Sequence, residues 1–261
     1  MKRFYLGTHR PKFLESRSGP FFVSAIRLRQ VPPRLPVKSK WALDSGGYSA
    51  LIRDGKWGVT AARYVQEVRD WREKFPGMEW AAIQDWMCEP EIIAKTGLTV
   101  KEHQKRTIRS WEKLNSLAPE IPWVPVLQGY TFAEYMAHLE AYDKAGVDLK
   151  SLPLVGLGTV CRRQKMNFAV ELVRELWGYG LKLHGFGFKV TGLKKCHPWL
   201  HSADSLAWSY AGRKAYHHRD EILCGGQGRH KGGCGNCQVW AEMWRKRVHK
   251  IIKEPVQLLL F

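Results

Sequence analysis

The stretch Trp41-Ala42-Leu43-Asp44-Ser45-Gly46-Gly47-Tyr48 is a short apolar run that ends in a carboxylate and a glycine turn. Other apolar runs of the chain end in the same way. The polar or glycine segments that follow them are Gln84-Asp85, Gln128-Gly129, Gly156-Leu157-Gly158 and Asp204-Ser205. In a barrel of parallel strands the reactive groups stand at the carboxyl ends of the strands. We therefore expect these segments to converge on one barrel mouth.

Eight apolar runs can be assigned as strands, and helical patterns separate most of them. The expected strands lie near Phe4–Gly7, Phe21–Ala25, Trp41–Leu43, Trp80–Ile83, Trp123–Leu127, Leu152–Leu157, Leu183–Phe188 and Ser202–Ala207. The expected helices are Val59–Lys74, Val100–Leu117, Phe132–Lys144, Met166–Tyr179 and Gln238–Ile252. This alternation predicts an α/β protein, a (β/α)8 TIM barrel of about 250 residues, formed as one domain over residues 1–261. A doubly wound open sheet is the alternative.

The charge balance points to a polyanionic partner. Lysine and arginine number 42 against 24 aspartates and glutamates, so the formal net charge is +18. Each phosphate that a cation neutralises releases counterions, which favours binding of nucleic acid. A basic surface that serves only solubility is the alternative. We find no apolar run of the ~18–20 residues that a membrane span needs and no signal-peptide segment, so we expect a cytoplasmic protein.

The segments at the strand ends, taken in chain order, resemble the signatures of guanine transglycosylases. They are Asp44–Tyr48, Asp85, Leu127–Gly129, Gly156–Leu157 and Asp204. Those enzymes are barrels that exchange guanine in a nucleic acid for a 7-deazaguanine base. Longer stretches are most similar to the DNA-modifying branch of phages and bacteria, the DpdA type. They are Trp41–Tyr48, Gln84–Pro90, Val126–Gly129, Val155–Arg163 and His184–Lys189.

The resemblance implies a double displacement at the sugar carbon C1′. Asp204 would be the nucleophile that forms a covalent glycosyl-enzyme. Asp44 would be the general acid and base that protonates the departing purine and deprotonates the incoming one. Exchange of a guanine base at C1′ of a nucleic acid is a glycosyl transfer, so these roles imply a glycosyltransferase.

The resemblance also implies a set of base-binding residues. Asp85 would accept hydrogen bonds from N1–H and the exocyclic amine of guanine, two donors that one carboxylate can serve. Gln128 and the backbone at Gly156 and Leu157 would contact the O6 acceptor, and Tyr48 would stack on the base. The other positions expected at the base are Ser45, Gly46 and Gly47.

One departure bears on the incoming base. The tRNA-modifying relatives carry a glutamate after their Gly-Leu pair that accommodates an aminomethyl group, whereas the run here is Gly158-Thr159-Val160-Cys161-Arg162-Arg163. This favours a base without a cationic arm, such as a nitrile-bearing, preQ0-like 7-deazaguanine. The alternatives are a tRNA-guanine transglycosylase and a non-catalytic nucleic-acid-binding subunit. Retention of Asp44 and Asp204 argues against the second, and the short chain leaves little besides the barrel to hold a folded tRNA.

Three of the six cysteines crowd near the C-terminus beside a histidine. The expected ligands of one structural zinc ion, within a subregion of residues 224–252, are Cys224, His230, Cys234 and Cys237. His249 matches the sequence order of the related tRNA enzymes, but about 12 residues of helix would carry it roughly 18 Å from Cys237. His230 is therefore the better fourth ligand. A cluster of reduced thiols without metal is the alternative.

Basic residues flank the expected nucleophile strand on both sides. They are Lys189, Lys194, Lys195, Arg213 and Lys214. In the related tRNA enzymes the corresponding segments contact the nucleic-acid backbone, so we expect these cations to border the barrel mouth and bind phosphates. A solvated basic rim is the alternative. If a phage encodes the protein, the compartment expected is the host cytoplasm.

Overall fold

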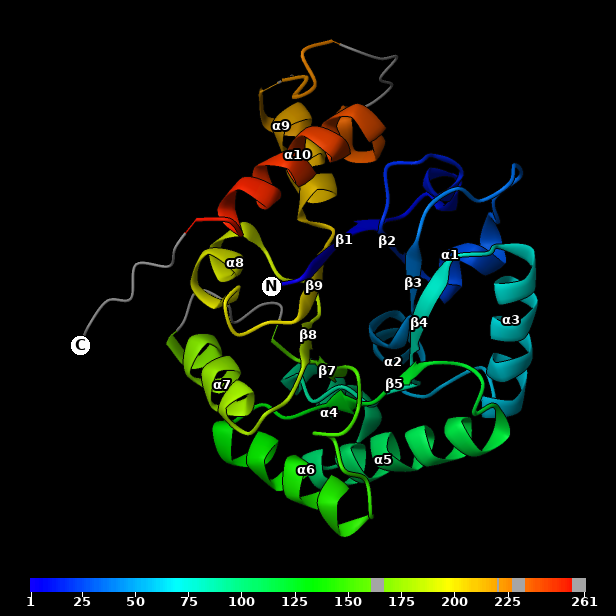
Figure 1. The fold of residues 1–261 in the computed structure, drawn as a ribbon, viewed down its shortest axis with the longest axis vertical. Helices are drawn as coiled ribbons and strands as arrows, with labels where there is room; N and C mark the ends of the chain where they lie inside the picture. Colours follow the sequence, from blue (N-terminus) through cyan, green and yellow to red (C-terminus); the bar gives the residue numbers. More distant parts are fainter. Residues whose placement is uncertain (161–166, 220, 227–232, 255–261) are drawn as a thin grey trace.

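The computed structural model describes residues 1–160, 167–219, 221–226 and 233–254. Within these ranges one parallel sheet curls into a barrel with helices around its outside (Figure 1). The strands are β1 (Arg3–Thr8), β2 (Phe21–Ser24), β3 (Trp41–Asp44), β4 (Met78–Ala82), β5 (Trp123–Val124), β6 (Val126–Leu127), β7 (Val155–Leu157), β8 (Leu183–Gly185) and β9 (Ser202–Ser205). The strand order is β5-β4-β3-β2-β1-β9-β8-β7-β6.

The barrel closes through the segment around Pro125. On one side β5 pairs with β4 at Ala82↔Val124, and on the other β6 pairs with β7 at Val126↔Gly156. Proline has no N–H to donate to a ladder, so the strand divides there, although the Pro125 carbonyl still accepts from the Gly156 N–H at 2.8 Å. β5 and β6 are therefore two halves of one barrel strand. The predicted eight-stranded barrel is confirmed, and the open sheet is excluded.

Ten helices are formed within the described residues, and most of them surround the barrel (Figure 1). They are α1 (Ala25–Gln30), α2 (Gly47–Asp54), α3 (Ala61–Lys74), α4 (Pro90–Thr96), α5 (Val100–Leu117), α6 (Phe132–Lys144), α7 (Asn167–Gly178), α8 (Val190–Cys196), α9 (Ala207–Arg219) and α10 (Gln238–Ile251), with 3-10 turns η1 (Pro11–Glu15) and η2 (Cys234–Asn236). Among the described helices, none is long and apolar enough to cross a bilayer.

Helix ends were predictable where a cap marks them. Thr99 accepts a hydrogen bond from the Glu102 N–H at the start of α5, and Thr131 and Glu134 form a complete capping box on α6. The short helices α1, α2, α4 and α8 were missed, because six to eight residues are too few for a periodic apolar pattern. The α9 helix was missed as well, since its first residue, Ala207, was included in the expected last strand.

The strand side chains alternate between two cores. In β1, Phe4 and Leu6 face the helices, whereas Tyr5 faces the barrel interior. There it meets Trp80, whose Nε1–H donates to the Tyr5 hydroxyl at 2.9 Å, and Phe22 packs against the same indole. This aromatic cluster packs the barrel interior with side chains.

Candidate active site

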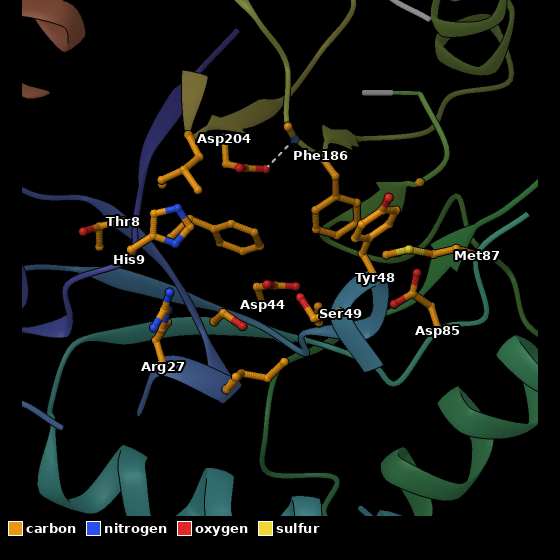
Figure 2. Close-up of a pocket in the computed structure, with 18 of the residues that line it drawn as sticks. Thr8, His9, Arg27, Asp44, Tyr48, Ser49, Asp85, Met87, Phe186 and Asp204 are labelled. Atoms are coloured by element: carbon orange, nitrogen blue, oxygen red, sulfur yellow. Dashed lines mark hydrogen bonds between the residues drawn. The ribbon is translucent and has the colours of Figure 1, made fainter. Parts of the chain in front are cut away.

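A cavity of ≈ 470 Å³ opens among the carboxyl ends of the strands. Three aspartates line it, Asp44 from the end of β3, Asp85 from the loop after β4 and Asp204 from β9. Figure 2 shows Asp44 and Asp204 pointing into the cavity and Asp85 at one side of it, near Tyr48 and Met87. The predicted convergence of these carboxylates is therefore present in the structure.

Asp204 is held by contacts from β8 and the turn after it. Its Oδ1 accepts a hydrogen bond from the Gly187 N–H at 2.9 Å, the dashed line in Figure 2. His184 Nε2 lies 3.4 Å from the same oxygen, and His184 Nδ1 lies 2.8 Å from the Ser202 hydroxyl. Burial lowers the pKa of His184 although the Asp204 carboxylate opposes that shift, so a neutral imidazole stands behind Asp204. One oxygen of Asp204 is thus anchored in place while the side chain still reaches the cavity.

Asp44 is a buried carboxyl group with a raised pKa. Burial raises the pKa of its carboxyl, the hydrogen bond from the Gly46 N–H opposes the shift, and the nearby charge of Asp204 raises the pKa further. The Gly46 N–H lies 3.1 Å from Asp44 Oδ1. Gly46 has a φ of 83°, a backbone conformation that a residue without a Cβ adopts readily. The glycine turn therefore aims an N–H at the carboxylate while the chain changes from β3 to α2.

Asp85 is 4% exposed and is bound to its neighbours rather than to solvent. Gln128 Nε2–H donates to Asp85 Oδ2, and the Ser45 hydroxyl lies 3.5 Å from Asp85 Oδ1. Burial raises the pKa of Asp85 to about 7, the Gln128 hydrogen bond opposes this, and the charges of Asp44 and Glu89 add to it. Asp85 is therefore a carboxyl group that titrates near neutral pH.

Gln128 is buried and does not line the cavity. Its amide nitrogen faces Asp85, and its Oε1 lies 2.6 Å from the Thr159 hydroxyl. Thr159 has a φ of 55°, which is unusual for a β-branched residue. Its Oγ1 also accepts the Cys88 N–H at 3.1 Å. In this arrangement Gln128 orients Asp85, and its expected contact with the base O6 stays a prediction.

Gly156 and Leu157 lie in β7, directly before Gly158 and Thr159, which line the cavity. Gly156 N–H donates to Pro125 and Gly158 N–H to the Leu127 carbonyl, so both N–H groups are used inside the sheet. A Cβ on Gly156 would collide with the ring of Phe186, and one on Gly158 with the Gln128 amide. Because both positions are glycines, the Phe186 ring can pack directly against the Gly156 backbone and the Gln128 amide against the Gly158 backbone.

Aromatic rings form another part of the cavity wall. Tyr48, in the first turn of α2, and Phe186, after β8, both line the cavity and are drawn there in Figure 2. Gly47 precedes Tyr48 and lies against the Trp57 ring and Asp85, where a Cβ would approach the indole to 3.2 Å. A flat ligand can thus meet ring faces here, while the carboxylates meet its polar edge.

The five basic residues expected at the mouth occupy different places. Lys189 is the N-cap of α8 just after β8, and Arg213 lies on α9, where its Nη1 donates to the Ser209 hydroxyl at 2.8 Å. Lys214 is exposed beside it. Lys194 and Lys195 lie in the last turn of α8, at the end of the helix that leads back to the start of β9. Phosphate binding by these five residues stays a prediction.

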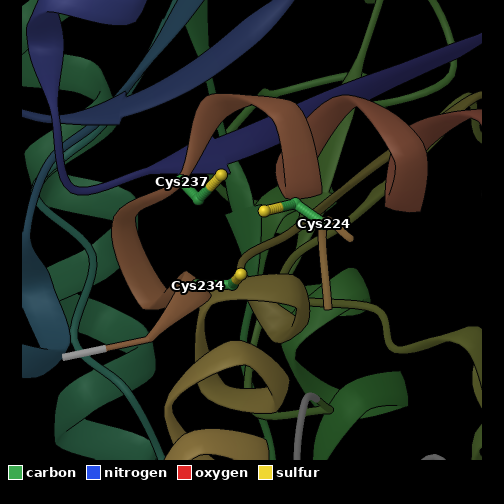
Figure 3. Close-up of side chains that lie close together, drawn as sticks. All are labelled: Cys224, Cys234 and Cys237. Atoms are coloured by element: carbon green, nitrogen blue, oxygen red, sulfur yellow. The ribbon is translucent and has the colours of Figure 1, made fainter. Parts of the chain in front are cut away.

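Cys224, Cys234 and Cys237 form a buried cluster, and their side chains point toward one another in Figure 3. Their sulfur atoms all lie within 4.8 Å of one another. Sulfur ligands of one tetrahedral zinc ion, each about 2.3 Å from the metal, lie about 3.8 Å apart, so these thiols fit three positions of such a site. Cys237 also caps α10, where its sulfur accepts the Trp240 N–H at 3.4 Å.

Two histidines are candidates for the fourth ligand. His230 lies outside the described residues. His249 does not join the cysteine cluster, and its ring packs edge-on against Phe4, with ring centroids 6.4 Å apart. The three cysteines could hold a metal, and among the described residues no other histidine or carboxylate joins them.

Sequence reasoning missed the side chains contributed by β1 and β2. Thr8 ends β1 and His9 follows it, Ser24 ends β2 and Arg27 lies in α1, and all four line the cavity. Thr8 and His9 come directly after the expected strand Phe4–Gly7, as Asp44 comes after Trp41–Leu43, and this signal could have identified both as candidates for the cavity. His184 was also missed, because a histidine inside an apolar strand gives no sign of which neighbour it meets.

The fold and the site together define an α/β barrel protein with three carboxyl groups and aromatic faces in a cavity at the carboxyl ends of its strands. The sequence model of the family DpdA, DeoxyPurine in DNA protein A, matches residues 1–259, and the chain belongs to this family. Membership gives the chain a DNA-modifying, transglycosylase-like role of the glycosyltransferase type.

A comparison with curated proteins gave no match. Among solved structures, the YdjI aldolase from Escherichia coli K12 is 12% identical, with a TM-score of 0.44, over 96% of this chain and 90% of that chain.

Proposed function

We propose that this protein exchanges guanine in DNA for a 7-deazaguanine base through a covalent glycosyl-aspartate intermediate. The observation that carries the proposal is the pairing of two differently held carboxyl groups in one cavity. Asp204 is anchored by the Gly187 N–H, whereas burial and the charge of Asp204 raise the pKa of Asp44. Carboxyl groups whose environments differ in this way suit a nucleophile and a proton donor.

In the first step Asp204 attacks C1′ of the nucleotide, and the bond from C1′ to purine N9 breaks with its electron pair moving to the purine. Asp44 donates a proton to the departing guanine. In the second step the Asp44 carboxylate takes the proton from N9 of the incoming base. That nitrogen attacks C1′ and releases Asp204, so the original anomeric configuration returns after two inversions.

Asp85 recognises the edge of the base, and the rings of Tyr48 and Phe186 stack on its faces. An ionised Asp85 accepts from two adjacent donors, N1–H and the exocyclic amine, which guanine and 7-deazaguanines share. Gln128 holds Asp85 in place from behind. The proposed incoming base is the nitrile-bearing, preQ0-like kind, and the cavity of ≈ 470 Å³ has room for a base.

DNA is the proposed polymer because the family is DNA-modifying, and tRNA is the alternative. The test is incubation of the protein with a labelled nitrile-bearing 7-deazaguanine and either guanine-containing DNA or tRNA. Label should enter DNA in the presence of the protein and not tRNA. Label in tRNA alone would contradict the proposed polymer, and label in neither would contradict base exchange.

The titration of Asp85 predicts how base binding depends on pH. A protonated Asp85 loses acceptor capacity, so affinity for the base should rise as the pH increases through about 7, the pKa that burial gives this carboxyl. Asp44, Glu89 and Gln128 are the groups that shift this pKa. The measurement is the KM for the incoming base across pH 6 to 8, where wild-type KM should fall about tenfold, as ionisation of one group near the middle of this range requires.

Two variants check the assignment. Asp85→Asn should flatten the profile. Gln128→Met should move it to higher pH, because the lost hydrogen bond no longer stabilises the ionised carboxyl. A profile that keeps its shape in Asp85→Asn, or that moves to lower pH in Gln128→Met, would assign the titration to another group.

For the cysteine cluster we propose one structural zinc ion, with His230 as the fourth ligand. Four protein ligands leave no open position on zinc, so the ion would supply no chemistry to the base exchange. Its role would be to hold the turn at η2 against α9. Gly212 of α9 lies so close to the Cys234 backbone that a Cβ would collide with it, and Ser209 Oγ donates to the Gly235 carbonyl at 2.6 Å.

A further inference from the structure

A second cavity, of ≈ 330 Å³, lies beside the active-site cavity. His9 and Arg27 line both cavities, so the second one continues from the mouth. Its remaining walls come from the segment Arg10–Lys12 and from Val31 and Asn236. We call it the rim groove. It joins three parts of the chain that are far apart in sequence: the loop after β1, helix α1 and the η2 turn of the cysteine cluster.

The rim groove is positively charged. Arg10, Lys12 and Arg27 are exposed side chains that line it, and no carboxylate is among its described lining residues. Arg27 donates to the neutral Gln30 side chain at 3.0 Å. Arg29, two residues further along the same helix, instead forms an ion pair with Glu67 at 2.7 Å. The groove therefore collects cations that form no ion pair with a described acid, directly beside a cavity lined by carboxylates.

The walls of the groove are fixed relative to one another through Trp208. Its Nε1–H donates to the Gly7 carbonyl at 2.7 Å, and its ring stacks on Phe13 of η1 with centroids 6.1 Å apart. The Trp208 carbonyl accepts from Trp240 Nε1–H at 2.9 Å, which joins the start of α10 to the same point. Arg10 N–H donates to the Thr8 hydroxyl at 3.0 Å. The groove is thus formed before any ligand arrives.

We propose that the rim groove binds the phosphodiester backbone of the DNA strand next to the nucleotide whose base is exchanged. The inference rests on the proposed function, because it takes the neighbouring cavity as the place of the reacting nucleotide. Arginine suits phosphate oxygens because its guanidinium donates two parallel hydrogen bonds. A strand whose target nucleotide enters the carboxylate-lined cavity must leave it at the rim, and the groove offers its phosphates three cations there.

The cavity and the rim groove carry opposite charges and therefore suit different parts of a nucleotide. Carboxylates in the cavity bind the donor edge of a base and would repel a phosphate, whereas the cations of the groove attract phosphate and carry no information about the base. The η2 turn contributes Asn236 to the wall of the groove, and the cysteine cluster holds this turn in place. Loss of the groove should weaken binding to every DNA sequence alike.

The test compares two double variants by fluorescence anisotropy with a labelled single-stranded, guanine-containing DNA across a salt series. Arg10→Ala with Lys12→Ala removes two groove cations. Lys105→Ala with Lys113→Ala removes two exposed cations from α5, on the other side of the barrel (Figure 1). Each lost phosphate contact on a single strand lowers the salt slope by about 0.7, so the groove variant should lose about 1.4 and bind on the order of tenfold more weakly. The α5 variant should match the wild type.

Equal losses in both variants would mean that DNA responds to the overall charge, and no loss in the groove variant would mean that phosphates bind elsewhere. Either result overturns the inference. The anisotropy measurement needs no base exchange, so it tests DNA binding by the groove even if the wild type exchanges no base. If the wild type exchanges bases and the groove variant binds DNA as the wild type does, the groove inference is wrong and the proposed function stands.

Discussion

Replacement of Asp204 by asparagine should abolish base exchange and the covalent protein–DNA species that precedes it. An amide is no nucleophile toward C1′, and loss of a nucleophile in comparable enzymes lowers kcat by several powers of ten, so we expect a loss of about 10⁴-fold or more. Asparagine has the same shape and can still accept from the Gly187 N–H, which lies 2.9 Å from Oδ1 in the wild type. The measurements are labelled-base incorporation and a denaturing gel for the covalent adduct.

Asp143→Asn is the matched control. Asp143 is exposed on α6, so the same chemical change there should leave both readouts unchanged. Unfolding temperatures should agree among wild type and both variants, which separates lost chemistry from lost structure. An Asp204→Asn protein that still forms the covalent adduct would assign the nucleophile to another residue of the cavity.

Cys234→Ser should release zinc and destabilise the protein. Cys234 is buried, and its sulfur is one of three within 4.8 Å of one another. Loss of a metal belongs to the few mechanisms that cost on the order of 4 kcal/mol in a single substitution. In a chain of this size that corresponds to a fall of about 10 °C in Tm. The measurements are the zinc content of the purified protein and its thermal unfolding.

Two further variants serve as controls for the zinc content. Cys196→Ser alters a buried thiol outside the cluster and should keep the zinc. His249→Ala should keep it too, because the His249 ring packs on Phe4 and not on the cysteines. Undiminished zinc in Cys234→Ser would contradict the site, and zinc loss in His249→Ala would contradict the choice of His230.

The barrel and its ring of polar strand ends were predictable because both depend on local order in the sequence. Apolar runs alternate with helical patterns, and parallel strands bring their carboxyl ends to one face whatever their side chains. Asp44, Asp85 and Asp204 therefore lie at one mouth, as their positions after apolar runs predicted. The cysteine cluster was predictable for a similar reason, since two of its three members are only three residues apart.

The sequence by itself determined that Asp44, Asp85 and Asp204 reach the mouth, and the tertiary structure decided what each of them meets there. Gln128 faces Asp85 rather than the cavity, and His184 stands behind Asp204, because neighbouring strands set these contacts across the sheet. The pKa of Asp85 depends on burial, which no local pattern encodes. The rim groove joins Arg10 to Asn236, more than two hundred residues away in sequence. Closure of the barrel brings the two together, since β1 pairs with the last strand and so carries its loop beside α9 and the cysteine turn.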